Sequence, residues 1–266
     1  MTEVDVYSRG VLTFRLLTKT SVECSTWPTV AISAPTGTVI LGGGGSVDWD
    51  ACGGCPCPAG NMLTAMYPDN TLTTWTVVAK DHIKASSARV TAYCIVAAMI
   101  TGPPISSANW AVINKTSLLA SQPTMKVDIP GFTIVGGGAR VNGTGSMLFE
   151  SYPNLNAWVG SATEHILPSP ATITVWAIGL KTTFLSNSGM SVSYFDSASS
   201  SSSHPKKTLV KPNFHLTGAG AKVKLIGDGN LLTASFPEDR QTVVAEATDH
   251  IKPNVTTVNA FAVGFL

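Results

Sequence analysis

The sequence predicts an all-β protein built from three internal repeats, and three observations lead to this expectation. A turn with an aromatic residue before proline occurs three times, as Met66-Tyr67-Pro68-Asp69, Ser151-Tyr152-Pro153-Asn154 and Ser235-Phe236-Pro237-Glu238. An acid–His–Ile triplet also occurs three times, as Asp81-His82-Ile83, Glu164-His165-Ile166 and Asp249-His250-Ile251. Clusters of Gly, Pro, Asn and Ser divide the chain into short apolar segments, which is the pattern of β-strands and turns. Self-similarity of this kind indicates a repeat architecture.

The repeats divide the chain into three segments of about 80–95 residues. We expect repeat 1 over residues 1–102, with a Cys-rich loop insertion, repeat 2 over 103–185, and repeat 3 over 186–266. Together they predict one compact assembly in a pseudo-threefold arrangement. The sequence leaves two arrangements open. One is β-prism-like, with three sheets around a common core, and the other packs three small six-stranded modules as a pseudo-trimer.

Six short strands are expected in each repeat, and repeat 2 shows why. The first precedes a Lys-Thr-Ser turn, the second follows Pro123, and the third contains a glycine run that predicts a bulge where backbones approach closely. The fourth leads into the Tyr-Pro turn, and the fifth begins beside Trp158 and ends at the acid–His pair. The sixth is apolar on both faces, which predicts a central, buried strand. These strands cover residues 110–114, 125–129, 132–141, 147–152, 157–163 and 171–180.

Composition narrows the function classes. Charged residues make up 12% of the chain and the formal net charge is +1, against about 25% charged residues in an average globular protein. This balance gives no electrostatic argument for nucleic acid as a partner. The chain contains no run of eighteen apolar residues, so no transmembrane segment is expected. The first residues lack the pattern of a signal peptide, so we expect cytoplasmic synthesis, with extracellular action only after lysis or non-classical export.

The repeated acid–His pairs admit four interpretations. Catalysis is disfavoured, because adjacent residues of a strand point to opposite faces, so that Asp81 is not placed to orient His82. A His₃ metal site would need His82, His165 and His250 to converge on an axis. A ligand site in each repeat would combine an exposed aromatic platform with these polar pairs. The structural interpretation is that each histidine closes a turn by bonding to backbone and each acid accepts a neighbouring N–H.

The candidate ligand-binding residues follow from the third interpretation. They are Trp75, Asp81, His82, Trp158, Glu164, His165, Asp249 and His250. No catalytic residue is expected.

The cysteines offer a second, weaker candidate site. Cys52, Cys55 and Cys57 lie close together in the inserted loop, where they could ligate a metal or form a disulfide between Cys52 and Cys55 or Cys57. Cys24 and Cys94 align with alanines of the other repeats, so both are expected to be small buried side chains.

These observations predict a non-enzymatic, multivalent recognition protein without a cofactor, most consistent with a carbohydrate-binding, lectin-like protein that has up to one site per repeat. Its partners would be glycans or glycoconjugates, with self-association as a further expectation. A first alternative is a structural component of a phage tail, virion or other self-assembling particle, in which the apolar C-terminal run from Ala260 to Leu266 would pack in its own fold or against a partner. A second is a receptor- or membrane-binding toxin.

Overall fold

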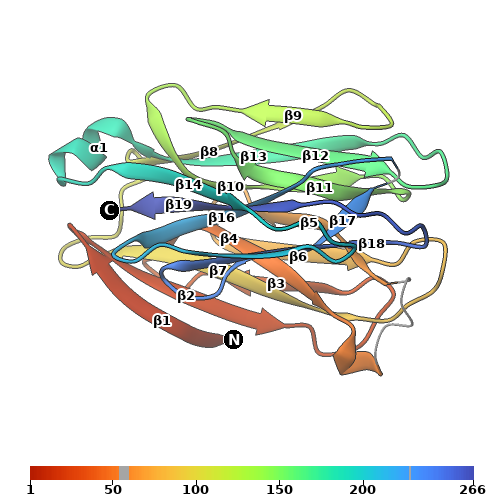
Figure 1. The fold of residues 1–266 in the computed structure, drawn as a ribbon. Coiled ribbons are helices and arrows are strands. Elements are labelled where there is room, and N and C mark those ends of the chain that lie inside the picture. The colour runs from red at the N-terminus through yellow and green to blue at the C-terminus, as the bar shows by residue number, and fades with distance from the viewer. Residues whose placement is uncertain (54–59, 228) are drawn as a thin grey trace.

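The structure is a computed structural model that describes residues 1–53, 60–227 and 229–266, and in these ranges the chain forms three antiparallel sheets (Figure 1). The all-β prediction is confirmed, because 60% of the residues lie in strands and 3% in helices. In Figure 1 most strands run along the long dimension of the molecule, and loops gather at its two ends.

Within each sheet, neighbouring strands pair in the following order. Sheet 1 contains β1 (Thr2–Arg9), β2 (Leu12–Thr20), β7 (Arg89–Met99), β4 (Val39–Asp48), β17 (Asn230–Pro237), β18 (Thr242–Asp249) and β15 (Lys206–Val210). Sheet 2 contains β3 (Thr29–Ser33), β6 (Thr74–Lys80), β5 (Met62–Pro68), β10 (Phe132–Asn142), β13 (Thr172–Lys181) and β8 (Trp110–Thr116). Sheet 3 contains β14 (Val192–Ala198), β19 (Val258–Phe265), β16 (His215–Val223), β11 (Ser146–Pro153), β12 (Trp158–Glu164) and β9 (Thr124–Val127).

The six strands predicted for repeat 2 are present as β8 to β13, with bounds that differ from the prediction by one to two residues at most ends. Strand β13 lies between β10 and the edge strand β8, and most of its residues are buried, as its two apolar faces predicted. Two short helices were not predicted, α1 (Thr182–Asn187) and the 3₁₀ helix η1 (Asp50–Cys52). Neither is long enough to show an amphipathic period in the sequence.

Each sheet combines strands from two repeats. In sheet 1, β2, β7 and β4 come from repeat 1, whereas β17, β18 and β15 come from repeat 3. Sheet 2 combines β8, β13 and β10 of repeat 2 with β5, β6 and β3 of repeat 1 in the same order. Sheet 3 combines β14, β19 and β16 of repeat 3 with β11, β12 and β9 of repeat 2. Among the described residues, the two halves of each sheet meet through two residue pairs only, such as Ala139–Met66 and Arg140–Ala65 between β10 and β5. The sequence did not predict this exchange of strands between repeats.

The bulge predicted in the glycine run is confirmed in all three repeats. The pairing register shifts between Ile40 and Gly42, between Ile134 and Gly136, and between Leu216 and Gly218. A Cβ atom on Gly136 would lie 2.0 Å from the carbonyl oxygen of Leu41, so a strand of sheet 1 and a strand of sheet 2 touch at this point through bare backbone. A larger residue at this contact would force the sheets apart.

The core is one continuous cluster of buried side chains drawn from all three sheets. A second, small cluster consists of Met62, Met147 and Leu231, which stand at corresponding positions in the three repeats. The apolar C-terminal run is packed by its own fold, because β19 lies between β14 and β16 and the side chain of Phe265 is fully buried. The run therefore gives no separate support to a particle-assembly function.

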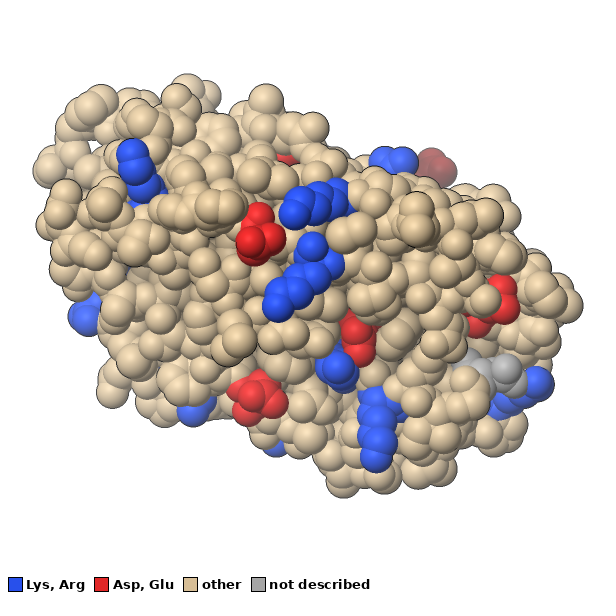
Figure 2. All heavy atoms as spheres, turned by 90° about the horizontal axis from the view of Figure 1, so that it is seen from above, with Lys and Arg blue, Asp and Glu red and all other residues tan. Residues whose placement is uncertain are grey.

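Charge is sparse on the surface. Figure 2 shows basic and acidic groups, several of them next to one another across the middle of the face, among a majority of uncharged atoms. Within the described ranges there is no helix whose length and apolar character would let it cross a membrane.

Candidate ligand-binding site

The two repeated tryptophans are buried, so the expectation that they form exposed platforms is wrong. Trp75 and Trp158 are each 1% exposed. Each indole lies against a glycine of the repeated run, Trp75 against Gly43 and Trp158 against Gly137. The indole N–H groups donate to the carbonyl oxygen of Gly44 and to Oγ of Ser151, both at 3.1 Å. These residues are core residues with satisfied polar atoms.

The three acids hold the loops that follow them. Asp81, Glu164 and Asp249 each accept a hydrogen bond from the backbone N–H five residues further on, at 3.2, 2.9 and 3.3 Å. This contact is the one that the structural interpretation predicted for the acids. It fixes a loop of the same shape in each repeat.

The three histidines come together in the interior, although they are far apart in sequence. The ring centroids of His82 and His165 are 5.5 Å apart, those of His82 and His250 5.9 Å, and those of His165 and His250 5.1 Å. The histidines are 8%, 0% and 0% exposed in chain order. Burial lowers the pKa of His82, and it lowers the pKa of His250 to about 4, with the neighbouring His165 and His82 adding to the effect. Burial therefore favours the neutral form of His82 and of His250 near pH 7.

The cluster does not have the properties of a metal centre. Nε2 of His82 lies 2.6 Å from the carbonyl oxygen of His165, so this nitrogen is already engaged with backbone. Among the residues that the structure describes, no group of three or more His, Cys, Asp or Glu side chains is arranged to hold a metal ion. His82 does bond to backbone, as the structural interpretation predicted, but it does so across two repeats rather than within its own turn.

The residue after each histidine adopts an unusual backbone conformation. Ile83, Ile166 and Ile251 have φ angles of 64°, 64° and 65°. Each isoleucine lies at the centre of a tight turn in which the N–H two residues after the histidine donates to the histidine carbonyl at 2.7 Å. A β-branched residue rarely adopts this conformation, so the surrounding contacts must hold it in place. The clustered histidines and the acid-bound loops provide these contacts.

An exposed aromatic side chain lies elsewhere, beside a pocket of about 210 Å³. Trp27, in the loop between β2 and β3, is 53% exposed and lines this pocket. Tyr67 of β5 and Arg140 of β10 line it as well, so the pocket lies where repeats 1 and 2 meet in sheet 2. The guanidinium of Arg140 lies 5.7 Å from the centre of the Tyr67 ring. Tyr67 in turn stacks on Trp176, with centroids 4.8 Å apart.

Lys80 is the least ordinary residue of this pocket. It is 2% exposed, and its ammonium has no hydrogen-bond partner among the described residues. Its Nζ lies over the Trp27 ring, 5.5 Å from the ring centre. Burial lowers the pKa of Lys80 to about 8, while the nearby Asp81 opposes the shift. Burying a charge without a hydrogen-bonding partner is costly, and the lowered pKa of Lys80 expresses this cost.

A second pocket, of about 170 Å³, lies beside the acid–His loop of repeat 2. Glu164 lines it together with Gln122 and Thr163, which correspond in the repeat to Trp27 and Lys80. Of the predicted site residues, the structure therefore brings Glu164 to a pocket wall and places the tryptophans and histidines in the interior.

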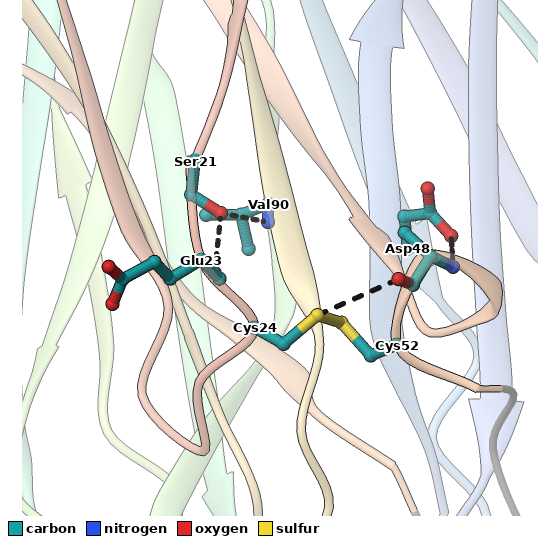
Figure 3. The surroundings of a disulfide bond; sticks show 7 residues. Ser21, Glu23, Cys24, Asp48, Cys52 and Val90 are labelled. Carbon is teal, nitrogen blue, oxygen red and sulfur yellow. Dashed lines mark hydrogen bonds between the residues drawn. A yellow bond between two sulfur atoms is a disulfide. The ribbon is translucent and has the colours of Figure 1, made fainter.

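The cysteine predictions need correction. Cys24 is not a buried single cysteine, because it forms a disulfide with Cys52, with Cα atoms 5.8 Å apart (Figure 3). Figure 3 shows the bond joining the segment after β2 to the η1 turn. Cys52 is thus unavailable as a metal ligand, and Cys55 and Cys57 lie outside the described residues. Cys94 is buried as predicted, and burial raises the pKa of its thiol.

Replacing Cys24 and Cys52 together by serine is expected to lower the free energy of unfolding by about 2–3 kcal/mol, because the bond closes a loop across 28 residues of the unfolded chain. Chemical denaturation of the parent and the variant measures the difference. Adding a reductant should destabilise the parent by a similar amount and leave the variant unchanged. Equal midpoints for parent and variant would show that the bond contributes nothing to stability.

Neither a scan against models of protein families nor a comparison with curated proteins finds a match to this chain. Its function must therefore be argued from the site itself.

The sequence contained a signal for the Trp27 pocket that single motifs did not reveal. When the prolines that close the first loop of each repeat are aligned, Trp27 corresponds to Gln122 and His204. When the histidines are aligned, Lys80 corresponds to Thr163 and Thr248. Both unusual residues of repeat 1 thus depart from the pattern at positions that come together in space.

Proposed function

We propose that this chain is a non-enzymatic recognition protein that binds glycans, and that the pocket beside Trp27 is its principal site. The observation that carries the proposal is the half-exposed Trp27 indole at the edge of a pocket that Tyr67 and Arg140 also line. An aromatic platform next to a few oriented polar groups is the usual composition of a small-ligand site. A pocket of about 210 Å³ suits a group smaller than a drug-sized ligand, such as one sugar residue.

We further propose that the three repeats are related by a pseudo-threefold axis. The three-way contacts of the histidines, of the small cluster at Met62, Met147 and Leu231, and of the glycine runs support such an axis. The platform residue is not repeated, however. Gln122 and His204 stand in its place, so the expectation of one equivalent site per repeat narrows to a principal site in repeat 1.

The remaining features are compatible with a binding role. The three clustered histidines are buried, and His82 and the acids are engaged with backbone. Disulfides persist in oxidising surroundings, so the Cys24–Cys52 bond favours action outside the reducing cytoplasm. We propose that the protein leaves the cell through lysis or through a non-classical export route.

Replacing Trp27 by glutamine, the residue of repeat 2, is expected to weaken glycan binding at least about tenfold, because aromatic residues contribute a large share of binding energy in such sites. The stability of the variant should change by less than about 0.5 kcal/mol, because the side chain is at the surface. A glycan array probed with the parent and the variant measures the first effect, and thermal unfolding the second.

Leu118→Ala is a matched control, since Leu118 is 89% exposed and does not line the pocket. It should bind like the parent. Unchanged binding by a folded Trp27→Gln variant would place the glycan elsewhere. If the folded parent binds no glycan, the lectin proposal fails.

A further inference from the structure

The pocket beside Trp27 is lined by two cations and, among the described residues, by no acid. The cations are Lys80 and Arg140. Within the described part of the chain, neither residue takes part in an ion pair. Both residues therefore line the pocket without an ion-pair partner from the described chain, with the Arg140 side chain exposed and the Lys80 ammonium buried beside the Trp27 ring.

The corresponding junction between repeats 2 and 3 shows what is missing. There, Lys222 lies opposite Glu150 across the two strands, and Nζ is 3.1 Å from a carboxylate oxygen of Glu150. Arg140 occupies the position of Lys222, but the residue opposite is Ala65. At the third junction the pair is Ser46 and Ala234, so an acid stands at this place in one of the three junctions and an alanine in the other two.

The positions of Trp27 and Lys80 show the same difference between repeats. In repeat 3, the corresponding residues are His204 and Thr248, and they hydrogen-bond to one another. In repeat 1 the lysine ammonium contacts the face of the indole and has no hydrogen-bond acceptor among the described residues. Lys80 and Arg140 thus both lack a hydrogen-bonded acid among the described residues of the same pocket.

We propose that this pocket binds a sugar carrying a carboxylate or sulfate group, with the anion bound by Arg140 and attracted by the buried charge of Lys80, and with the ring against Trp27. The inference rests on the proposed glycan-binding function, because it names the ligand class for the same pocket. A guanidinium offers paired donors to a carboxylate or sulfate, and an ammonium adds a point charge. The anion supplies the charge that Glu150 supplies at the other junction.

Lys80→Thr is the sharpest test, because threonine stands at this position in both other repeats, so the fold accommodates it. The probes are glucose, glucuronate and glucose 6-sulfate, which share a ring and differ at one carbon, with the galactose series beside them. The parent should prefer an acidic member over its neutral counterpart at least about tenfold, and Lys80→Thr should lose most of that preference. The two acidic probes distinguish a carboxylate from a sulfate ligand.

Ala65→Glu is the complementary variant. It places a carboxylate opposite Arg140, as Glu150 lies opposite Lys222, and should abolish the preference for acidic sugars in protein that circular dichroism shows to be folded. Leu118→Ala again serves as the unaffected control.

The pH dependence gives an independent readout. Apart from Asp81 and His82, which follow it in the chain, the groups near Lys80 at the pocket are Arg140 from β10 and Tyr67 from β5. The anion binds the protonated amine, whose pKa in the free protein is about 8, so affinity should fall about tenfold from pH 7 to pH 9. In Lys80→Thr this decline should disappear.

Two results would overturn the inference in distinguishable ways. If the parent binds neutral and acidic probes equally, or if Lys80→Thr and Ala65→Glu keep the parent's preference, the proposal of an anionic ligand is refuted. The proposal of glycan binding would still stand. If no probe and no array glycan binds the folded parent, both the inference and the proposed function fall.

Discussion

Replacing Trp158 by valine is expected to lower the free energy of unfolding by about 3 kcal/mol or more, because a fully buried indole is removed and the cavity can collapse only in part. Trp158 is 1% exposed, and its ring fills the space above Gly137. Chemical denaturation measures the loss. Trp27→Gln is the control, since the same residue type is removed from the surface and stability should hardly change.

Repeat 3 suggests how this loss is partly recovered. Where repeats 1 and 2 have a glycine and a tryptophan, repeat 3 has Ala219 and Val243, and both are buried. A Cβ atom on Gly137 would lie 2.4 Å from Cγ of Trp158, so Gly137→Ala alone should also destabilise. The double variant Trp158→Val/Gly137→Ala should lose about 1 kcal/mol less free energy of unfolding than the two single variants lose together. Strict additivity would show that the two positions do not pack as a unit.

Acid is expected to destabilise the protein through the histidine cluster. The pKa of His250 is lowered to about 4 in the folded state, whereas a histidine in the unfolded chain titrates near 6.5. The unfolded state therefore binds more protons below pH 6.5, so stability is complete above that pH and is lost as the pH falls towards 4. For His250 alone the loss is about 2 kcal/mol between pH 7 and pH 5, approaching about 3 kcal/mol at lower pH. The lowered pKa of His82 adds to it.

The free energy of unfolding, measured by denaturant titration at several pH values, tests this account. His250→Gln carries no titrating group at this position. Its free energy of unfolding at pH 7 should be lower than that of the parent, because packing is lost. Between pH 7 and pH 5, however, this free energy should fall less steeply with pH than that of the parent. Keeping to pH 5 and above limits the contribution of carboxylates. An unchanged slope in His250→Gln would mean that the cluster does not control the acid response.

The strands were predictable because their signals are local. Alternating apolar residues, the Tyr-Pro turn and the glycine run mark β8 to β13 within the sequence itself. The bulge at Gly136 followed from the absence of a side chain. The partner of each strand is not a local property. Nothing in the sequence near β5 indicates that it pairs with β10 of the next repeat through two residue pairs, so the exchange of half-sheets emerged only from the structure.

The site was less predictable than the fold. Repetition drew attention to Trp75, Trp158 and the histidines, but a residue is repeated when each unit needs it for packing, and these residues are buried. The pocket instead depends on Trp27 and Lys80, two positions at which repeat 1 differs from the others. The Cys24–Cys52 bond escaped notice for a related reason. Alignment with Ala120 suggested a buried side chain, whereas the insertion unique to repeat 1 brings a partner to it.

The most direct test of the central claim is an NMR titration that follows the indole N–H signals of the six tryptophans. The protein is titrated with glucuronate and, separately, with glucose, and the Trp27 signal is assigned by its absence from Trp27→Gln. We expect a saturable shift of the Trp27 signal, larger with glucuronate, while the signals of the buried Trp75 and Trp158 stay in place. A Trp27 signal that neither sugar moves, together with shifts at other tryptophans, would contradict the assignment of this pocket as the binding site.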